Sequence, residues 1–307
     1  MKAIAFHAPG GPEVLLPVEL PTPEVGPGEV RVRMRAAGVQ PVDLAIREGF
    51  VPPGVRIGSP HVVGGDFAGV VDAVGAGVTA FAVGDEVLGY RAQGTYAEFV
   101  VVPVGQVVAR PAGVPWEQAG ALSASGQTAH TALEVLEVGL GDTFLVNGAA
   151  GGVGSVAVQL AVERGAVVIA AARPEHHGWL RELGARPVAY GAGLVERARA
   201  LAPGGIVHAA LDTASVAGLE AACELVADRG RVGTVFAAER AVELGARWIR
   251  SDRRPERLAA LAERLGDGRL RVHVRETFPL ERAADAHRAM AVGHGRGKIV
   301  LLGPATA

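Results

Sequence analysis

The segment Thr143-Phe-Leu-Val-Asn147-Gly-Ala-Ala-Gly151-Gly-Val-Gly154-Ser-Val-Ala-Val-Gln-Leu-Ala161 decides the fold of this chain. Its first part, Thr143–Asn147, has the apolar composition of a buried strand, and a short turn of glycine and alanine follows. An apolar helical pattern then begins at Gly154. A strand, a small-residue turn and a helix in this order indicate a βαβ unit with parallel strands.

The turn of this segment has the composition of a phosphate-binding loop. Small residues let the backbone approach a pyrophosphate, and the N–H groups and positive dipole end of the next helix then face the phosphates. Ala149 replaces the first glycine of a strict GxGxxG pattern, and Gly154 allows close packing of the helix on the strand. A plain strand–turn–helix corner is the alternative. The residues of this turn predicted to belong to the cofactor site are Ala149, Ala150, Gly151, Gly152, Val153 and Gly154.

The end of the next predicted strand, Val167–Ala172, bears on the choice of dinucleotide. An NAD-selective site places Asp or Glu there, where the carboxylate accepts from the ribose hydroxyls. Here Arg173 follows the strand, and a guanidinium suits bidentate recognition of a 2′-phosphate. We therefore predict NADPH as the cofactor, bound by Arg173 together with His176 and Tyr190. The alternative for Arg173 is an ordinary surface cation.

Strand and helix patterns alternate along the chain after this point. Such alternation predicts a parallel sheet with right-handed crossovers. The predicted helices are His177–Leu183, Val216–Val226, Arg254–Leu265 and Leu280–Met290, and the predicted strands are Val207–Leu211, Gly230–Phe236 and Lys298–Leu302.

The first 120 residues have a different character. Short candidate strands alternate with turns that contain glycine and proline. In Glu29–Arg35, for example, apolar and polar residues alternate with the period of two that is typical of a half-buried strand. Many short strands joined by such turns predict a compact, barrel-like β domain.

Composition narrows the class of protein further. The length of 307 residues predicts about two domains, and 49% hydrophobic with 20% charged residues excludes a disordered chain. A formal net charge of −2 provides no basic field for nucleic acid. Cys223 is the single cysteine, so an intramolecular disulfide is excluded. No apolar run reaches about 18 residues and no signal-peptide core is present, so we expect a cytoplasmic protein without a membrane segment.

Five segments, in order along nearly the whole chain, carry recognisable motifs: Gly38–Gly49, Val63–Val71, Ala149–Gly154, Phe278–His287 and Gly297–Leu301. Together they resemble the medium-chain dehydrogenase/reductase superfamily, and specifically its zinc-free quinone oxidoreductase branch. The resemblance implies a GroES-like β-barrel domain over residues 1–121 and a Rossmann-type, doubly wound parallel-sheet dinucleotide-binding domain over 122–266. It also implies that residues 267–307 return to the first domain.

The resemblance also bears on metal binding. Zinc-containing relatives carry a Cys in the first of these segments and Gly-His-Glu in the second, whereas this chain has Gln40 and Gly65-Asp66 at the matching positions. Gln and Gly do not replace a thiolate and an imidazole as zinc ligands. We therefore expect no metal site, and we expect Asp66 to be a structural carboxylate.

By position in the family pattern, three residues are candidates for the substrate site. The resemblance places Gln40 and Asp43 beside the nicotinamide end of the cofactor. Many relatives carry a Tyr near the position of Phe50, and Phe50 cannot donate a proton. We expect Phe50 to pack against a flat substrate, with core packing as the alternative.

Three further cofactor contacts are implied by the resemblance. Thr128 would contact the cofactor near its nicotinamide or pyrophosphate. The loop Val235–Ala238, which contains Phe236, would border the nicotinamide. Lys298 would close over the cofactor from the C-terminal segment, and an exposed charge at the end of a strand is its alternative role.

These features favour one function and leave two others open. The leading hypothesis is an NADPH-dependent reductase of quinones or α,β-unsaturated carbonyls, in which the protein positions an electron-poor acceptor and hydrogen bonds its developing oxyanion. The second is an enoyl-thioester reductase. The third is a weakly catalytic NADPH-binding protein with a sensor, structural or RNA-binding role. The resemblance also implies a homodimer paired through edge strands, for which Ala241–Ile249 is the candidate segment.

Overall fold

The computed structural model describes residues 1–52, 54–293 and 295–304. The contacts among them define two compact units. Unit 1 takes the chain up to Ala124, from Arg254 to Gly293 and from Lys298 onward, and unit 2 takes Ser125–Arg253 and Gly295–Gly297.

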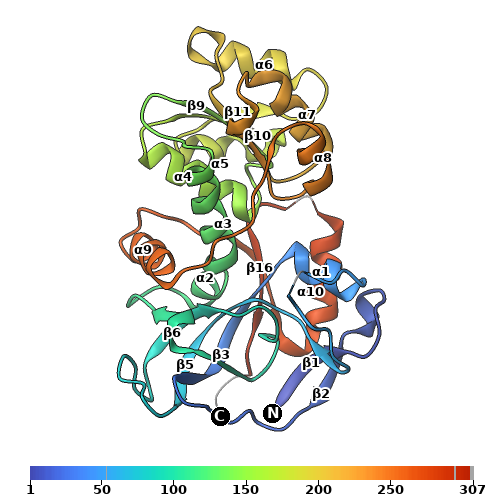
Figure 1. Cartoon of the computed structure of the whole chain (residues 1–307), viewed down its shortest axis with the longest axis vertical. Coiled ribbons are helices and arrows are strands. Elements are labelled where there is room, and N and C mark those ends of the chain that lie inside the picture. The colour runs from blue at the N-terminus through green and yellow to red at the C-terminus, as the bar shows by residue number, and fades with distance from the viewer. Residues whose placement is uncertain (53, 294, 305–307) are drawn as a thin grey trace. The chain divides into compact units, whose positions relative to one another are not determined.

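A largely antiparallel sheet of seven strands forms the frame of unit 1 (Figure 1). Its strands are β3 (Glu29–Val39), β5 (Asp66–Val74), β6 (Glu86–Tyr90), β7 (Phe99–Pro103), β8 (Val107–Ala109), β15 (Val274–Pro279) and β16 (Lys298–Leu302). They lie in the order β15-β16-β3-β5-β6-β8, and β7 also pairs with β3. From Val30 to Met34, buried apolar residues alternate with arginines, which confirms the predicted period of two.

A second sheet and several helices complete unit 1. The strands β1 (Lys2–Phe6), β2 (Leu16–Glu19) and β4 (His61–Val62) lie in the order β2-β1-β4. One buried apolar cluster joins the two sheets, with Phe6 of β1, Val32 of β3 and Ile299 of β16 among its members. The helices and 3-10 turns are α1 (Pro41–Arg47), α2 (Trp116–Gly120), α9 (Pro255–Gly266), α10 (Ala283–Val292), η1 (Pro12–Val14), η2 (Val104–Gln106) and η6 (Leu280–Arg282).

Unit 2 is built on a six-stranded parallel sheet. The strands are β9 (Thr143–Asn147), β10 (Val167–Ala172), β11 (Arg186–Ala189), β12 (Ala209–Asp212), β13 (Val232–Thr234) and β14 (Arg247–Trp248). Their order, β11-β10-β9-β12-β13-β14, reverses direction between β9 and β12. This reversal is the switch point of a doubly wound, Rossmann-type sheet, so the predicted fold class is confirmed.

Helices flank the strands of this sheet in sequence. Helix α3 (Leu122–Val135) begins in unit 1 and ends in unit 2. The others are α4 (Gly152–Glu163), α5 (His177–Glu182), α6 (Leu194–Leu201), α7 (Val216–Leu225) and α8 (Ala238–Glu243), with η3 (Pro174–His176), η4 (Pro203–Gly205) and η5 (Arg229–Arg231). Among the described residues, no helix has both the length and the apolar character needed to cross a membrane.

The predicted edge strand Ala241–Ile249 is wrong over its first part. Residues Ala238–Glu243 form α8, which buries Ala241. Gly245 then takes a left-handed conformation, with φ of 70°, and ends the helix. Arg247–Trp248 alone pair with β13, and they form the edge of the sheet.

The division into units also differs from the predicted boundary at residues 266 and 267. Helix α9 belongs to unit 1, where its apolar face of Leu258, Leu261 and Leu265 is buried. A Cβ on Gly266 would lie 2.6 Å from the Cβ of Pro111, so the end of α9 packs tightly on the loop after β8. An amphipathic pattern indicates that one face of a helix is buried, but it does not indicate which domain packs against that face.

Candidate functional site

The glycine-rich loop connects β9 to α4 at the end of the sheet where the strand order reverses. Asn147 ends the strand and Gly151 is the N-cap of the helix, whose first turn presents N–H groups without intrahelical acceptors. A Cβ on Gly154 would lie 2.3 Å from the carbonyl oxygen of Gly148, so only glycine fits at that position. The loop therefore brings a helix N-terminus close to a strand end, which is the geometry that suits a pyrophosphate.

Asp212, at the end of β12, holds this loop from the neighbouring strand. Its carboxylate is fully buried, and Oδ1 accepts a hydrogen bond of 2.8 Å from Nδ2 of Asn147. The hydroxyl of Thr213 donates to the carbonyl oxygens of Asn147 and Gly148 at 2.9 and 3.2 Å. The start of the loop is thus fixed by β12 as well as by β9.

The same carboxylate fixes the loop after β13. Oδ2 of Asp212 accepts from the hydroxyl of Thr234 at 2.9 Å, and that hydroxyl oxygen accepts from the N–H groups of Phe236 and Ala237 at 3.1 and 3.3 Å. Phe236 itself is 64% exposed. Asp212 therefore links the glycine-rich loop to the loop that the sequence predicts beside the nicotinamide. Sequence reasoning missed this residue, although an Asp at the end of an apolar strand is a readable signal.

Beyond the end of β10, the structure brings Arg173 and Tyr190 together. Nε of Arg173 donates to the hydroxyl of Tyr190 at 3.2 Å, and Nη1 lies 3.8 Å from Oε1 of Glu175. Nε2 of His176 lies 3.9 Å from the same Glu175 oxygen, and burial lowers the pKa of His176. The positive charges of Arg296 and Arg173 lower the pKa of His176 further, so both arginines lie near this imidazole.

The remaining predicted residues lie on both units. Thr128 lies on α3 within unit 2, where it is partly buried. Phe50 follows α1 in unit 1 and is 50% exposed, so the alternative of core packing is wrong. Lys298 begins β16 in unit 1 and is 4% exposed, so the alternative of an exposed strand-end charge is wrong.

Gln40 is the centre of a buried polar cluster in unit 1. Nζ of Lys298 donates to its Oε1 at 2.6 Å, and its Nε2 donates to Oδ2 of Asp66 at 2.8 Å. The backbone N–H of Ala124 donates to the same Asp66 oxygen at 2.8 Å. An ammonium on one side and a carboxylate on the other thus fix the orientation of the Gln40 carboxamide.

Asp43 holds the backbone of Gln40. Oδ2 of this buried carboxylate accepts from the N–H of Gln40 at 2.8 Å and from the hydroxyl of Tyr96 at 3.2 Å. Burial raises the pKa of Asp43 to about 7, and the nearby charge of Asp66 acts in the same direction. The hydrogen bond from Gln40, together with Tyr96 and Lys298, opposes this rise.

Three residues of the cluster were not singled out as site residues from the sequence. These residues are Tyr96, Arg47 and His287. Tyr96 and His287 contact each other edge to face, and Arg47 adjoins His287. A weak signal existed, because His287 lies on the same helix face as the buried Ala283 and Ala286.

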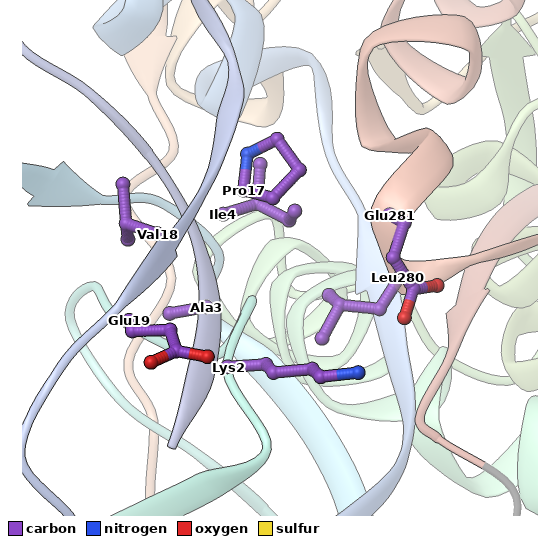
Figure 2. Close-up of a pocket in the computed structure, with 8 residues that line it drawn as sticks. All are labelled: Lys2, Ala3, Ile4, Pro17, Val18, Glu19, Leu280 and Glu281. Carbon is purple, nitrogen blue, oxygen red and sulfur yellow. The ribbon is translucent and has the colours of Figure 1, made fainter.

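A pocket of about 200 Å³ lies elsewhere on unit 1, along β1, β2 and η6. Figure 2 shows Leu280 and Glu281 on one side of it and Ile4 and Pro17 on the other. None of the predicted site residues lines this pocket. In the part of the chain that the structure describes, no three His, Cys, Asp or Glu side chains are grouped so that they could hold a metal ion.

Family profiles match segments from both parts of the chain. The profile described as "Alcohol dehydrogenase GroES-like domain" matches residues 26–112. The profile described as "Zinc-binding dehydrogenase" matches residues 183–301.

Named proteins are similar over nearly the full length. A quinone oxidoreductase of Pseudomonas aeruginosa is 34% identical over 98% of this chain and 99% of its own. The structure of the Escherichia coli quinone oxidoreductase complexed with NADPH is 26% identical, with a TM-score of 0.85 over 98% of this chain and 100% of that chain. Polyketide synthase GfsB of Streptomyces halstedii is 33% identical over 98% of this chain, which spans 6% of the synthase. This chain therefore belongs to the medium-chain dehydrogenase/reductase superfamily, in which it is similar to quinone oxidoreductases.

Proposed function

We propose that the protein is an NADPH-dependent, zinc-free oxidoreductase that transfers hydride to quinones or α,β-unsaturated carbonyl compounds. One observation carries the proposal: Arg173 joins Tyr190 beyond β10, where an NAD-selective site would hold a carboxylate. The glycine-rich loop follows the adjacent strand β9. The similarity to named quinone oxidoreductases supports the same function.

NADPH fits the residues that unit 2 provides. Glycine at positions 151, 152 and 154 leaves little side-chain bulk at the start of α4, so backbone N–H groups would face the pyrophosphate. Arg173 and Tyr190 would hold the 2′-phosphate through charge-assisted hydrogen bonds. The exposed ring of Phe236 would border the nicotinamide, which supplies the hydride when bound. The residues proposed to line the pyrophosphate are Ala149, Ala150, Gly151, Gly152, Val153 and Gly154.

The chemistry of the Gln40 cluster supports a zinc-free site. The carboxamide oxygen, which is the one metal-binding atom that Gln40 offers, already accepts a hydrogen bond from Lys298. A divalent cation at that oxygen would face the lysine ammonium at close range. Asp66 accepts from Gln40 and from a backbone N–H, as expected for a structural carboxylate.

Without a metal, the acceptor must be electrophilic by itself, and the protein must stabilise the negative charge that develops on its oxygen. Gln40 is the proposed donor. Its Nε2 carries two hydrogens, of which Asp66 accepts one, so the other is available for a substrate oxygen. Asp43 fixes the backbone from which this side chain projects, and the half-exposed ring of Phe50 would pack against a flat substrate.

The test is oxidation of NADPH and of NADH with 1,4-benzoquinone, a panel of enones and a panel of enoyl-thioesters. We expect turnover of quinones or enones, with NADPH preferred over NADH. Gln40→Leu should lower kcat with little change in NADPH affinity, because it removes the proposed donor. Binding of NADPH without its consumption by any acceptor would instead favour the sensor or structural role.

The second candidate, an enoyl-thioester reductase, is supported by the similarity to a segment of polyketide synthase GfsB. Reduction of a conjugated thioester requires the same hydride transfer to a β-carbon, so the sites described here do not separate the two substrates. The same assay does. A kcat/KM for enoyl-thioesters well above that for quinones and enones would favour this candidate.

We further propose a homodimer that pairs through the edge of the unit 2 sheet. The edge strand β14 carries Trp248, which is 46% exposed and lies beneath the guanidinium of Arg250. Sedimentation should then give twice the chain mass of 31.4 kDa, and Trp248→Glu should give the single mass. A wild-type protein that sediments as a monomer would overturn the proposed dimer.

Location in the cytoplasm remains a prediction, which cell fractionation can check.

A further inference from the structure

Helix α1 ends in a buried arginine that the proposed function does not use. Arg47 is 1% exposed, although arginine is almost never fully buried unless it is paired. Its Nε donates to the carbonyl oxygen of Gly10 at 3.0 Å, and Nη2 contacts the carboxylate of Glu48. The remaining terminal nitrogen, Nη1, lies 3.3 Å from Nδ1 of His287, which is fully buried on α10.

The arginine fixes the tautomer of the histidine. A guanidinium can only donate, so Nδ1 of His287 must accept and can carry no hydrogen. The hydrogen of the neutral imidazole therefore lies on Nε2, which is 3.3 Å from the hydroxyl oxygen of Tyr96. Burial and the charge of Arg47 lower the pKa of His287 to about 3, so the neutral form persists through the physiological range.

The histidine in turn fixes the hydroxyl of Tyr96. Because the oxygen accepts from Nε2 of His287, its own hydrogen is directed to Oδ2 of Asp43 at 3.2 Å. Tyr96 is 0% exposed, so water does not compete for this hydrogen. Hydrogen bonds thus run in one direction from Arg47 through His287 and Tyr96 to Asp43, and the Asp43 oxygen also accepts the N–H of Gln40.

We propose that Tyr96 and His287 are positioning residues which, with Arg47, orient Asp43 as the acceptor that fixes the backbone of Gln40. The chain of hydrogen bonds stands on its own geometry, and its effect on turnover rests on the proposed function. The hydrogen-bond chain gives a reason for the buried Arg47 side chain next to the apolar face of α10. It also extends the site to α10 and to the segment before β7, which no motif in the sequence connected with Gln40.

The state of Asp43 depends on the groups that surround it. The Tyr96 hydroxyl favours the charged carboxylate, so loss of that hydroxyl raises the pKa of Asp43 further. Loss of His287 acts in the same direction, because the hydroxyl is then free to rotate away. The charged and titratable groups that face Asp43 are Asp66 from β5, Lys298 from β16 and Tyr96 before β7, with His287 from α10 and Arg47 of α1 behind Tyr96.

The hydrogen-bond chain is tested first by ¹⁵N NMR of the imidazoles, without cofactor or substrate. The signals of His287 are those that disappear in His287→Gln or in His287→Asn. This imidazole should remain the neutral Nε2–H tautomer down to its pKa of about 3. Arg47→Lys should change its ¹⁵N shifts, because the donor to Nδ1 is altered. An Nδ1–H tautomer, or a charged His287 imidazole at pH 6, would overturn the proposal whether or not the protein has activity.

The effect on the site is tested by the pH dependence of NADPH oxidation. In Tyr96→Phe, the acid limb of the kcat–pH profile should move up by about one to two pH units, the size expected for one hydrogen bond to a charged group, with little change in KM for NADPH. The variant that combines Tyr96→Phe with His287→Gln should move it no further, because His287 acts through the hydroxyl. If Tyr96→Phe fails to fold, His287→Gln alone should show a shift of the same sign.

The matched control is His208→Gln, because His208 also accepts through Nδ1, from the N–H of Thr143 at 2.8 Å in unit 2. The acid limb of the kcat–pH profile of His208→Gln should coincide with that of the wild type. An unshifted limb in both Tyr96→Phe and His287→Gln would overturn the positioning role. Absence of any turnover in the wild type would overturn the proposed function instead, and the NMR result would still decide the chain of hydrogen bonds.

Discussion

At the scale of single residues, a substitution at Gly154 tests the proposed phosphate-binding loop most directly. In Gly154→Ala the new Cβ would lie 2.3 Å from the carbonyl oxygen of Gly148, so α4 must move away from the loop. We expect overpacking to cost about 1–3 kcal/mol of unfolding free energy and NADPH affinity to fall by roughly tenfold or more. Urea unfolding and calorimetry measure the two effects.

The matched glycine is Gly178 of α5, where a Cβ would meet no atom within 4 Å. Gly178→Ala should keep both NADPH affinity and stability. Equal affinities in the two variants would show that the close approach at Gly154 does not serve the cofactor.

We propose that Arg173 determines the preference between the two cofactors. Arg173→Ala should raise KM for NADPH by roughly 10- to 100-fold, because a hydrogen bond to a charged group contributes about 1.5–3 kcal/mol. KM for NADH should stay the same, since NADH lacks the 2′-phosphate. Arg186→Ala is the control, because Arg186 lies at the other end of β11 and donates to the carbonyl oxygen of Leu201 at 2.8 Å. An equal rise of KM for both cofactors would contradict the assignment.

The positions of these residues could be predicted from the sequence because each position is set by one neighbouring strand. Gly154 and Arg173 each follow a strand at a fixed short distance along the chain. Tyr96 and His287 are different, because 191 positions separate them and the fold of unit 1 brings them together. A single sequence can indicate that His287 is buried but does not connect it with Tyr96, and it also does not show that Lys298 contacts Gln40 across 258 positions.

At the scale of elements, Asp212 ties together the ends of β9, β12 and β13. Oδ1 accepts from Asn147 and from two backbone N–H groups at 3.2 Å, and Oδ2 accepts from Thr234. Asp212→Asn replaces one acceptor with a donor, which leaves buried donors unpaired. We expect a loss of about 1–3 kcal/mol in urea unfolding and a higher KM for NADPH.

Asp228→Asn provides the comparison for Asp212. Oδ1 of Asp228 accepts from the N–H of Gly230 at 2.8 Å in an exposed turn, where water can replace the bond. Its stability should change by less than about 0.5 kcal/mol, with KM for NADPH unchanged. If both variants behave alike, Asp212 does not link the two loops.

Strands that are buried along their whole length were predicted more accurately than a strand that is mostly exposed. Strands β9, β10 and β16 have the predicted bounds, because each is a continuous apolar run. Strand β15 was missed, since Phe278 is its one buried residue and its other residues are half-buried or exposed. Helix α9 was predicted correctly as an element, but its contacts group it with unit 1, because its partner beside Pro111 lies far away in the sequence.

At the scale of the whole molecule, two buried groups have opposite effects on stability in acid. His287 has a pKa of about 3 against an ordinary 6.5, so the unfolded chain binds the extra proton and stability falls as the pH drops from 6.5 to 3. Asp43 has a pKa of about 7 against an ordinary 3.8, so the folded chain binds the extra proton and stability rises as the pH drops from 7 to 3.8. The two contributions largely cancel between pH 6.5 and 3.8.

Asp43→Asn should unmask the contribution of His287. Compared with wild type, the variant should lose about 1.4 kcal/mol more of unfolding free energy for each pH unit below 6.5. Urea unfolding at a series of pH values measures this difference. Parallel pH profiles for the two proteins would mean that Asp43 does not take up a proton in this range.

The central claim is that unit 2 binds a phosphorylated nicotinamide nucleotide without the help of a metal. Calorimetry of NADPH and NADH binding, on protein dialysed against a strong chelator, tests it most directly. We predict one NADPH site per chain. The affinity for NADH should be roughly 10- to 100-fold weaker, because NADH lacks the 2′-phosphate and the hydrogen bonds to it. Absence of NADPH binding, equal affinities for the two nucleotides, or binding that returns only when zinc is added back would contradict the account.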